Sequence, residues 1–241
     1  MTTLAGHAIE HSIETNMLTK HGSPDFLKKL YKQAQTIQVH KNHMFFLRED
    51  KAESFYIVLH GWVKLFRESI DGNQAVIDVL TAGHTFGENA LFENMAYPYS
   101  AEAVETAQLI KLPLQLLKDE IEDNPKMAMA MLKTMSKYRT QQDMELEHRT
   151  LQNAPQRIGC FLLKLLPHPD SKDPQDINLP YDKTLVSSRL GMQPETFSRA
   201  LGKLKKEADL EVKGSHITIT NVDKLAEFCC SACSTIFPCG D

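Results

Sequence analysis

The sequence lacks the features of a membrane protein, a secreted protein or an enzyme. No apolar run approaches the roughly 20 residues of a membrane-spanning helix, and the N-terminus has no apolar core of a signal peptide. No nucleophile–base pair, phosphate-cradling glycine-rich loop or paired-carboxylate signature stands out. We therefore expect a cytoplasmic protein that has no membrane partner and is not an enzyme.

Length, composition and charge are those of an ordinary globular protein. The 241 residues exceed what one small domain needs and predict two domains. The net charge of −4 argues against a general polyanion binder. Between Lys183 and Lys213, however, seven Lys and Arg residues stand against four acids, a local charge of +3. Such local basic charge suits contact with phosphates, although a solvated helix surface has a similar pattern.

Short β-rich segments alternate with turn residues over the first half of the chain, after a polar stretch that we expect to be a mobile arm. Glycines mark several of the turns, among them Gly61, Gly83 and Gly87. Several short strands at near-regular spacing predict an antiparallel barrel or jelly roll. The β-rich segments are 54–59, 62–66, 75–80 and 107–112.

A long helix is predicted next, because about thirty residues between Pro125 and Asn153 contain no glycine or proline. Residues at a spacing of three and four form a stripe compatible with a coiled-coil seam. A second copy of the chain is the economical partner for this stripe, and packing against the β-rich domain is the alternative. The stripe consists of Ala128, Leu132, Met135, Gln142, Leu146 and Arg149.

The C-terminal third has the pattern of a helix-turn-helix. Residues 184–190 form a short amphipathic run, and Gly191 supplies a tight turn. Gln193 is positioned to cap the following helix, and Pro194 suits the first turn of that helix. Residues 212–219 then have the pattern of a β-hairpin, which would form a wing.

The second helix of this motif has a buried and an exposed side. Glu195, Ser198 and Arg199 lie together near its N-terminal end, the part of a recognition helix that enters the major groove. Arginine binds guanine through two hydrogen bonds, glutamate accepts from cytosine, and serine is permissive. A helical hairpin with no role in DNA binding is the alternative. Three apolar residues at i, i+4 and i+7 form the predicted buried stripe: Phe197, Leu201 and Leu204.

The order of these parts, with three motifs, resembles the CRP/FNR superfamily of bacterial transcription regulators over roughly Phe26 to Phe228. The motifs are Gly61-Trp62-Val63-Lys64-Leu65, the segment from Gly83 to Phe92, and Glu195-Thr196-Phe197-Ser198-Arg199. The resemblance implies an α+β fold in which a β-roll like that of cyclic-nucleotide-binding domains precedes a long dimerisation helix and a winged helix-turn-helix. The implied segments are a mobile arm at 1–20, a β-roll at 21–123, a dimerisation helix at 124–153, a DNA-binding domain at 154–227 and a cysteine-rich tail at 228–241.

The resemblance also implies a function. The Glu-x-x-Ser-Arg form of the recognition helix is that of the FNR branch, which reads palindromes with TTGAT-type half-sites. We therefore expect a homodimer that binds double-stranded DNA, works with RNA polymerase and presents two recognition helices about one helical turn apart. The expected DNA-binding residues are Gln193, Glu195, Thr196, Ser198, Arg199 and Lys203.

Cyclic AMP is not expected to be the signal. Relatives that bind it pair its phosphate with the arginine of a Pro-Arg-Ser/Thr-Ala segment. Here the matching segment is Pro98-Tyr99-Ser100-Ala101, so a tyrosine occupies the arginine position. A cyclic phosphate would lose its charge-assisted partner there.

The cysteines point to a different signal. Four of the five lie within eleven residues, and the N-terminal region has none. Such crowding in a cytosolic protein indicates metal or redox chemistry, and cysteine is the usual ligand of iron–sulfur centres. Some FNR-like regulators carry a C-terminal cysteine group, and this resemblance implies a 4Fe–4S cluster that senses oxygen, redox state or nitric oxide. The expected ligands are Cys230, Cys233 and Cys239, with Cys229 as competitor and Asp143 as a candidate fourth.

Several alternatives stay open. The tail is compatible with a thiol–disulfide switch, another metal such as zinc, or an inert segment. His40 and His43 have a spacing that suits haem, although exposed histidines at a strand edge are the simpler interpretation, and Cys160 is expected to be a small core residue. The alternative functions are a thiol-, haem- or small-molecule-responsive regulator without a cluster, and a ligand module of the cyclic-nucleotide type that acts through protein contacts.

Overall fold

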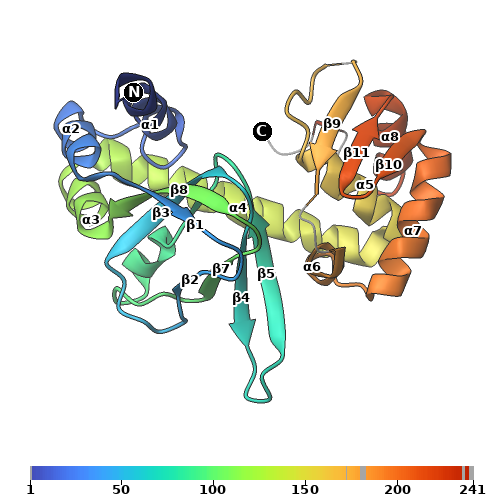
Figure 1. Cartoon of the computed structure of the whole chain (residues 1–241), viewed down its shortest axis with the longest axis horizontal. Helices are drawn as coiled ribbons and strands as arrows, with labels where there is room; N and C mark the ends of the chain where they lie inside the picture. The colour runs from blue at the N-terminus through green and yellow to red at the C-terminus, as the bar shows by residue number, and fades with distance from the viewer. Residues whose placement is uncertain (1, 172, 180–182, 235–236, 239–241) are drawn as a thin grey trace. The chain divides into compact units, whose positions relative to one another are not determined.

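The computed structural model describes residues 2–171, 173–179, 183–234 and 237–238 (Figure 1). The chain divides into two units, Met1–Ser136 and Lys137–Asp241, each with its own hydrophobic core. None of the helices that the structure describes combines the length and the apolar character needed to cross a membrane.

Two antiparallel four-stranded sheets form the N-terminal unit. The first has the strand order β1 (Gln35–Val39), β8 (Ala107–Pro113), β3 (Ser54–His60) and β6 (Thr85–Phe86). The second has the order β2 (Met44–Phe46), β7 (Ser100–Ala103), β4 (Val63–Glu68) and β5 (Gln74–Leu80). This β-roll confirms the fold class expected from the sequence. Its fully buried side chains include Phe55, Phe66, Phe86, Leu109 and Ile110.

The Gly61 turn shows why the β-roll requires glycine between β3 and β4. Gly61 has a φ of 88°, in the left-handed region that favours glycine. A Cβ atom at this position would lie 2.8 Å from the Cα atom of Ala107 at the start of β8. The turn can therefore approach β8 closely only without a side chain.

The N-terminal segment differs from the mobile arm expected at 1–20. It contains α1 (Thr2–Thr15), and α2 (Pro24–Gln33) follows. Ile13 is fully buried and Leu18 is 5% exposed, so both belong to the core of the unit. The Asn16 side chain donates hydrogen bonds to Gly83 O at 3.2 Å and to Thr85 Oγ1 at 2.9 Å, which attaches the segment to the turn before β6 and to β6 itself.

Three further helical segments follow strands of the N-terminal unit along the chain. A short 3-10 helix, η1 (Glu88–Phe92), follows β6, and α3 (Leu114–Asp123) follows β8. Ser23 caps α2 by accepting from Phe26 N, and its own N–H and hydroxyl both donate to the Glu120 carboxylate on α3, at 2.7 and 2.9 Å. The long helix α4 (Pro125–Leu151) begins in this unit, where Met127 and Met131 are buried in its core.

The C-terminal unit combines helices with a three-stranded sheet. After α5 (Ala154–Lys164), strand β9 (Gln175–Asn178) pairs with the expected hairpin, formed by β10 (Leu210–Lys213) and β11 (His216–Ile219). Ile177 lies opposite Ile217 and joins β9 to the hairpin. The helices α6 (Lys183–Arg189), α7 (Pro194–Glu207) and α8 (Val222–Cys230) complete the unit.

Close packing of three helices in this unit depends on a glycine, which has no side chain. Gly159 lies on α5, where an added Cβ atom would overlap Cys229 Sγ and lie 3.0 Å from Leu225 Cδ1, both on α8. Leu204 on α7 contacts the same place, with its Cδ1 3.4 Å from the position of that Cβ atom. The three helices therefore meet at Gly159.

We expect Gly159→Ala to lower the free energy of unfolding of the C-terminal unit by about 1–3 kcal/mol, because an added methyl group overpacks the meeting point. Gly202→Ala is the matched control: it lies in α7 with nothing within 4 Å of the new Cβ atom, and we expect stabilisation by about 0.5–1 kcal/mol. Urea unfolding followed by circular dichroism measures both. Equal effects at the two positions would contradict the packing described here.

Candidate nucleic-acid interface and cysteine tail

The helix α7 presents one buried and one exposed side. Phe197 and Leu204 are fully buried and Leu201 is 5% exposed, as the spacing predicts. Their burial against the core of the C-terminal unit fixes the rotation of α7 about its own axis. The opposite side of the helix therefore faces solvent.

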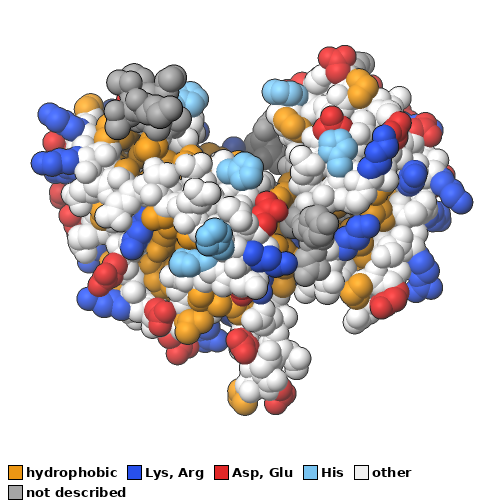
Figure 2. Space-filling model, viewed as in Figure 1, with side chains coloured by type: hydrophobic (Ala, Val, Ile, Leu, Met, Phe, Trp, Pro, Cys, Tyr) orange, Lys and Arg blue, Asp and Glu red, His pale blue; other side chains and the backbone are white. Residues whose placement is uncertain are grey.

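The six residues expected to bind DNA lie on that exposed side or at the start of the helix. Five of them are exposed, and Thr196 is half-buried. Figure 2 shows Lys and Arg side chains over the part of the C-terminal unit where Figure 1 places α7. Arg199 donates a long hydrogen bond, 3.4 Å from its Nε to Glu195 O. The exposed residues are Gln193, Glu195, Ser198, Arg199 and Lys203.

The start of α7 is formed differently from the sequence expectation. Gln193 occupies the N-cap position, but its side chain makes no capping hydrogen bond to the described residues. Instead its carbonyl oxygen accepts from Phe197 N at 2.9 Å, and Pro194 begins the helix. Gly191, with a φ of 63°, makes the turn after α6. The Gln193 side chain is therefore available to solvent and to DNA.

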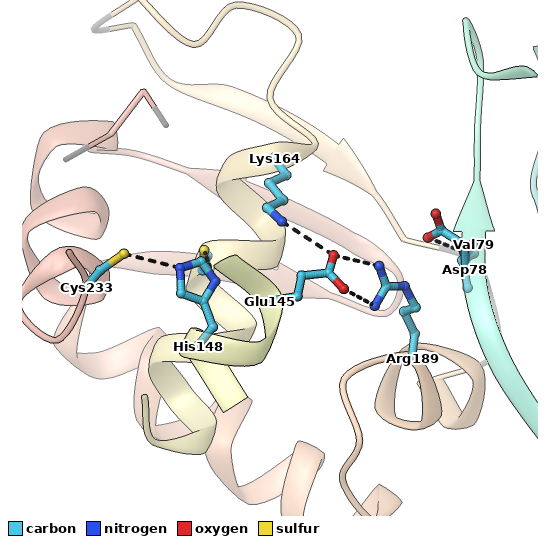
Figure 3. Close-up of polar contacts among 8 residues, drawn as sticks. Asp78, Val79, Glu145, His148, Lys164, Arg189 and Cys233 are labelled. Atoms are coloured by element: carbon cyan, nitrogen blue, oxygen red, sulfur yellow. Dashed lines mark hydrogen bonds and ion pairs between the residues drawn. The ribbon is translucent and has the colours of Figure 1, made fainter. Parts of the chain in front are cut away.

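An ion-pair network connects the helix-turn-helix to α4. Arg189, the last residue of α6, donates two hydrogen bonds to the Glu145 carboxylate, at 2.7 and 2.9 Å (Figure 3). Lys164 on α5 lies 3.6 Å from the same carboxylate. Burial opposes ionisation of Glu145, but the bonds to Arg189 and the charge of Lys164 keep its pKa below the usual value. Arg189, counted in the local charge of +3, is thus paired within the protein.

The tail cysteines do not share one environment. Cys229 is fully buried in the hydrophobic core, against Gly159. Cys230 and Cys233 are half-buried, and Cys239 lies outside the described residues. Cys229, expected as a competing metal ligand, thus lies in the core cluster of the C-terminal unit.

A histidine that the sequence analysis did not single out lies between two of the cysteines. His148 on α4 is 6% exposed. Its Nε2 lies 3.2 Å from Cys233 Sγ (Figure 3), and its Nδ1 lies 3.6 Å from Cys160 Sγ. Burial, reinforced by the charge of Lys164, lowers the pKa of His148, so the ring is favoured in its neutral form. Cys160 is buried, as expected, but beside a polar partner.

The described residues do not assemble a cluster site. Within the described ranges, no group of three or more His, Cys, Asp or Glu residues is arranged to hold a metal ion. Asp143, the candidate fourth ligand, is exposed and forms an ion pair with Arg139 one turn earlier, at 3.2 Å. Cys239, the third expected cysteine ligand, lies outside the described residues.

In the segments that match the cyclic-nucleotide motif, side chains contact other groups of the protein. The Tyr99 hydroxyl accepts from the N–H of Gly87 at 3.1 Å. Tyr97 stacks on Phe46, with ring centroids 3.5 Å apart, within the core of the roll. Glu88 is 6% exposed, its Oε2 has no hydrogen-bond partner among the described residues, and burial raises its pKa to about 7.

The two histidines weighed as haem ligands lie at the surface. His40 and His43 are both exposed, and the His43 ring contacts Phe45 with centroids 5.2 Å apart. Their positions agree with the simpler interpretation, that of exposed histidines beside a strand.

Two family models match the chain, one for each unit. A cyclic nucleotide-binding domain matches residues 36–124, and a Crp-like helix-turn-helix domain matches residues 156–228. Together with the exposed side of α7, they define a class of protein: a β-roll joined by a long helix to a DNA-binding domain.

Relatives identify the family. The fumarate and nitrate reduction regulatory protein of Escherichia coli K12 is 29% identical over 206 residues, which cover 84% of this chain and 81% of that protein. The anaerobic regulatory protein of Aggregatibacter actinomycetemcomitans is 28% identical, with coverage of 84% and 79%. A crystal structure of a protein from Ruegeria pomeroyi, described as cyclic nucleotide binding, is 32% identical with a TM-score of 0.71, covering 93% of this chain and 98% of that one. The chain belongs to the CRP/FNR family of transcription regulators.

Glu88 gives this structure a testable pH dependence. Its pKa rises from 4.5 to about 7 on folding, so the folded protein binds this proton more tightly than the unfolded chain. The free energy of unfolding therefore falls as the pH rises through that window and stays lower above it. We expect Glu88→Gln, which cannot ionise, to be more stable than wild type at pH 8 by about 1–3 kcal/mol, and the difference to shrink toward pH 5.

Chemical denaturation between pH 5 and pH 8 measures this effect. Glu93→Gln, an exposed carboxyl beside the same 3-10 helix, is the control and should follow wild type. An unchanged stability difference across the pH range would contradict the buried position of Glu88.

Proposed function

We propose that this regulator binds TTGAT-type palindromes as a homodimer and reads them with Glu195, Ser198 and Arg199. The observation that carries the proposal is the exposure of these three side chains on the N-terminal half of α7, opposite the buried stripe. Arginine and glutamate there match the hydrogen-bonding edges of guanine and cytosine in the major groove. Lys203, farther along the same helix, would contact a phosphate.

An exposed apolar row on α4 supports the dimer. Leu132, Met135 and Leu146, three residues of the expected seam, are 59, 40 and 66% exposed. A helix normally buries such residues, and a second α4 related by a twofold axis would cover them. The same axis would place the two recognition helices on one face of the DNA, where RNA polymerase is the expected further partner.

The signal is proposed to be oxygen, redox state or nitric oxide, received through the cysteine tail. The support is the naming of relatives for anaerobic regulation and for fumarate and nitrate reduction, together with four cysteines in eleven residues. In an iron–sulfur mechanism, Cys230, Cys233 and Cys239 would be ligands of a 4Fe–4S cluster. A bound cluster would link these cysteines through iron–sulfur bonds, and oxidation of the cluster would break this link. The described part of the tail offers two of these three thiols, Cys230 and Cys233, at half-buried positions.

Arg199→Ala tests the base-reading role. We expect its affinity for TTGAT-N4-ATCAA DNA to fall by about 1–3 kcal/mol, and its discrimination against a substituted guanine to be lost. Lys203→Ala is the matched control: it should weaken binding to all sequences alike and reduce the salt dependence. Mobility-shift titrations measure both. Wild-type protein that ignores this site in both oxidised and anaerobic form would refute the proposed function.

Iron analysis tests the cluster. Protein purified and reconstituted under nitrogen should contain about four iron atoms per chain and absorb visible light if the tail binds a 4Fe–4S cluster. Cys230→Ser should lose this iron, and Cys160→Ser should retain it. A preparation that is free of iron under strict anaerobiosis would overturn the cluster and leave the thiols themselves as the sensing groups.

A further inference from the structure

The tail contacts α4 and α5 on both sides of their junction. Only Gln152 and Asn153 separate the end of α4 from the start of α5. Before the junction, Ser234 donates two hydrogen bonds to the Glu147 carboxylate, from N and Oγ, both at 2.8 Å. Beyond it, Gln156 donates to Phe228 O at 3.3 Å and to Ser231 Oγ at 3.0 Å. We call residues 228–234, with these contacts, the clasp.

A further bond attaches the clasp to the junction itself. Gln152 donates from Nε2 to Cys229 O at 3.4 Å. The Asn153 side chain accepts from Gln156 N, and the Gln156 side chain accepts from Asn153 N, a capping box that begins α5. Gln156 thus serves both the helix start and the clasp. Displacing the tail would remove polar partners on both sides of the two-residue connection.

Cys233 is the thiol within the clasp. It precedes Ser234, and its sulfur lies 3.2 Å from Nε2 of the buried His148 (Figure 3). The two nitrogens of an imidazole point to different edges of the ring, so a single ion cannot bind both. His148 uses one edge for Cys233 and the other for Cys160. The three side chains therefore form a row, thiol–imidazole–thiol, in which each thiol contacts a different nitrogen of His148. They do not converge on one position as the ligands of a single metal ion do.

We propose that Cys233 is a site of modification by hydroperoxides, and that its oxidation opens the clasp. This inference rests on the proposed DNA binding and redox signal, concerns the protein without a cluster, and names the group through which that signal reaches the DNA-binding unit. The supporting geometry is the half-buried Cys233 thiol beside a buried imidazole, next to the Ser234 contact on Glu147.

The reaction with hydrogen peroxide is a two-electron oxidation of sulfur. The Cys233 sulfur attacks one peroxide oxygen, an S–O bond forms and the O–O bond breaks. The thiol proton passes to the departing hydroxide, which leaves as water, and the product is a sulfenic acid.

The product does not fit the contact that the thiol makes. An oxygen atom added to Cys233 Sγ needs space within the 3.2 Å that separates the sulfur from His148 Nε2. We expect the oxidised side chain to leave its place beside the ring. Ser234 N belongs to the peptide that follows Cys233, so a backbone shift that makes room for the added oxygen would break the paired bonds from Ser234 to Glu147. The end of α4 then loses its link to the tail.

The neighbouring cysteines provide matched controls. Cys230 is half-buried like Cys233 and lies three residues earlier, at the end of α8. Cys160 and Cys229 are 7% and 0% exposed, so peroxide should reach them slowly. Ser234→Ala removes one clasp bond and leaves every thiol in place.

Peptide mass spectrometry of the full-length protein tests the modification. Reduced protein in the presence of a chelator is treated with hydrogen peroxide and trapped with a sulfenic-acid reagent. We expect labelling at Cys233 first, and faster amide hydrogen exchange over residues 147–156 afterwards. Cys230→Ser should keep both responses, and Cys233→Ser should lose both. Preferential labelling of another cysteine, or unchanged exchange after labelling of Cys233, would overturn the proposal.

DNA titration tests the consequence. Oxidised wild type should bind TTGAT-N4-ATCAA about tenfold more weakly than reduced wild type, whereas Cys233→Ser should bind equally under both conditions. Untreated Ser234→Ala should weaken binding in the same direction, without oxidation. Reduced wild type that fails to bind at all would refute the proposed function, while the labelling and exchange results would still decide the role of Cys233. Equal weakening of Cys233→Ser by peroxide would overturn that role.

Discussion

The burial of Phe197, Leu201 and Leu204 determines what the rest of the C-terminal unit can do. With these side chains inside the core, α7 has one possible rotation, and Glu195, Ser198 and Arg199 must face outward. The core can accept them because α5, α7 and α8 meet where Gly159 has no side chain. Packing of apolar groups thus decides which polar groups reach solvent, and the proposed base recognition would depend indirectly on a glycine on another helix.

Electrostatic contacts extend this constraint to the long helix. Glu145 on α4 receives Arg189 from α6 and Lys164 from α5, so one carboxylate links three helices of the unit. Two residues later on the same helix, the Ser234 bonds to Glu147 add the tail. Residues near the end of α4 therefore contact both the tail and the helix-turn-helix. A change in the tail would act close to the residues that hold the helix-turn-helix.

The sequence predicted elements whose signals are local. The α4 bounds, Pro125–Leu151, lie within the expected 124–153, and Gly191 marks the turn of the helix-turn-helix. Contacts between distant residues were missed: Asn16 reaches Gly83 and Thr85, so the expected arm is partly a docked helix, and His148 meets Cys233 85 positions later. Neither contact is marked by a periodic pattern in the sequence. The candidate base-reading residues were found because helical spacing separates buried from exposed positions. Spacing alone left Cys229 as a competitor of Cys230, and did not indicate that Cys229 is fully buried.

The same reasoning applies to the β-roll. In this chain a Tyr99 hydroxyl accepts from the Gly87 N–H, and the stacked pair of Phe46 and Tyr97 belongs to the core. Glu88 stays buried with an oxygen that has no described partner, at a cost in stability that rises with pH. In the mechanism we propose, the β-roll would support the long helix, and the sensing chemistry would lie where the Cys233 sulfur meets the His148 imidazole in the C-terminal unit.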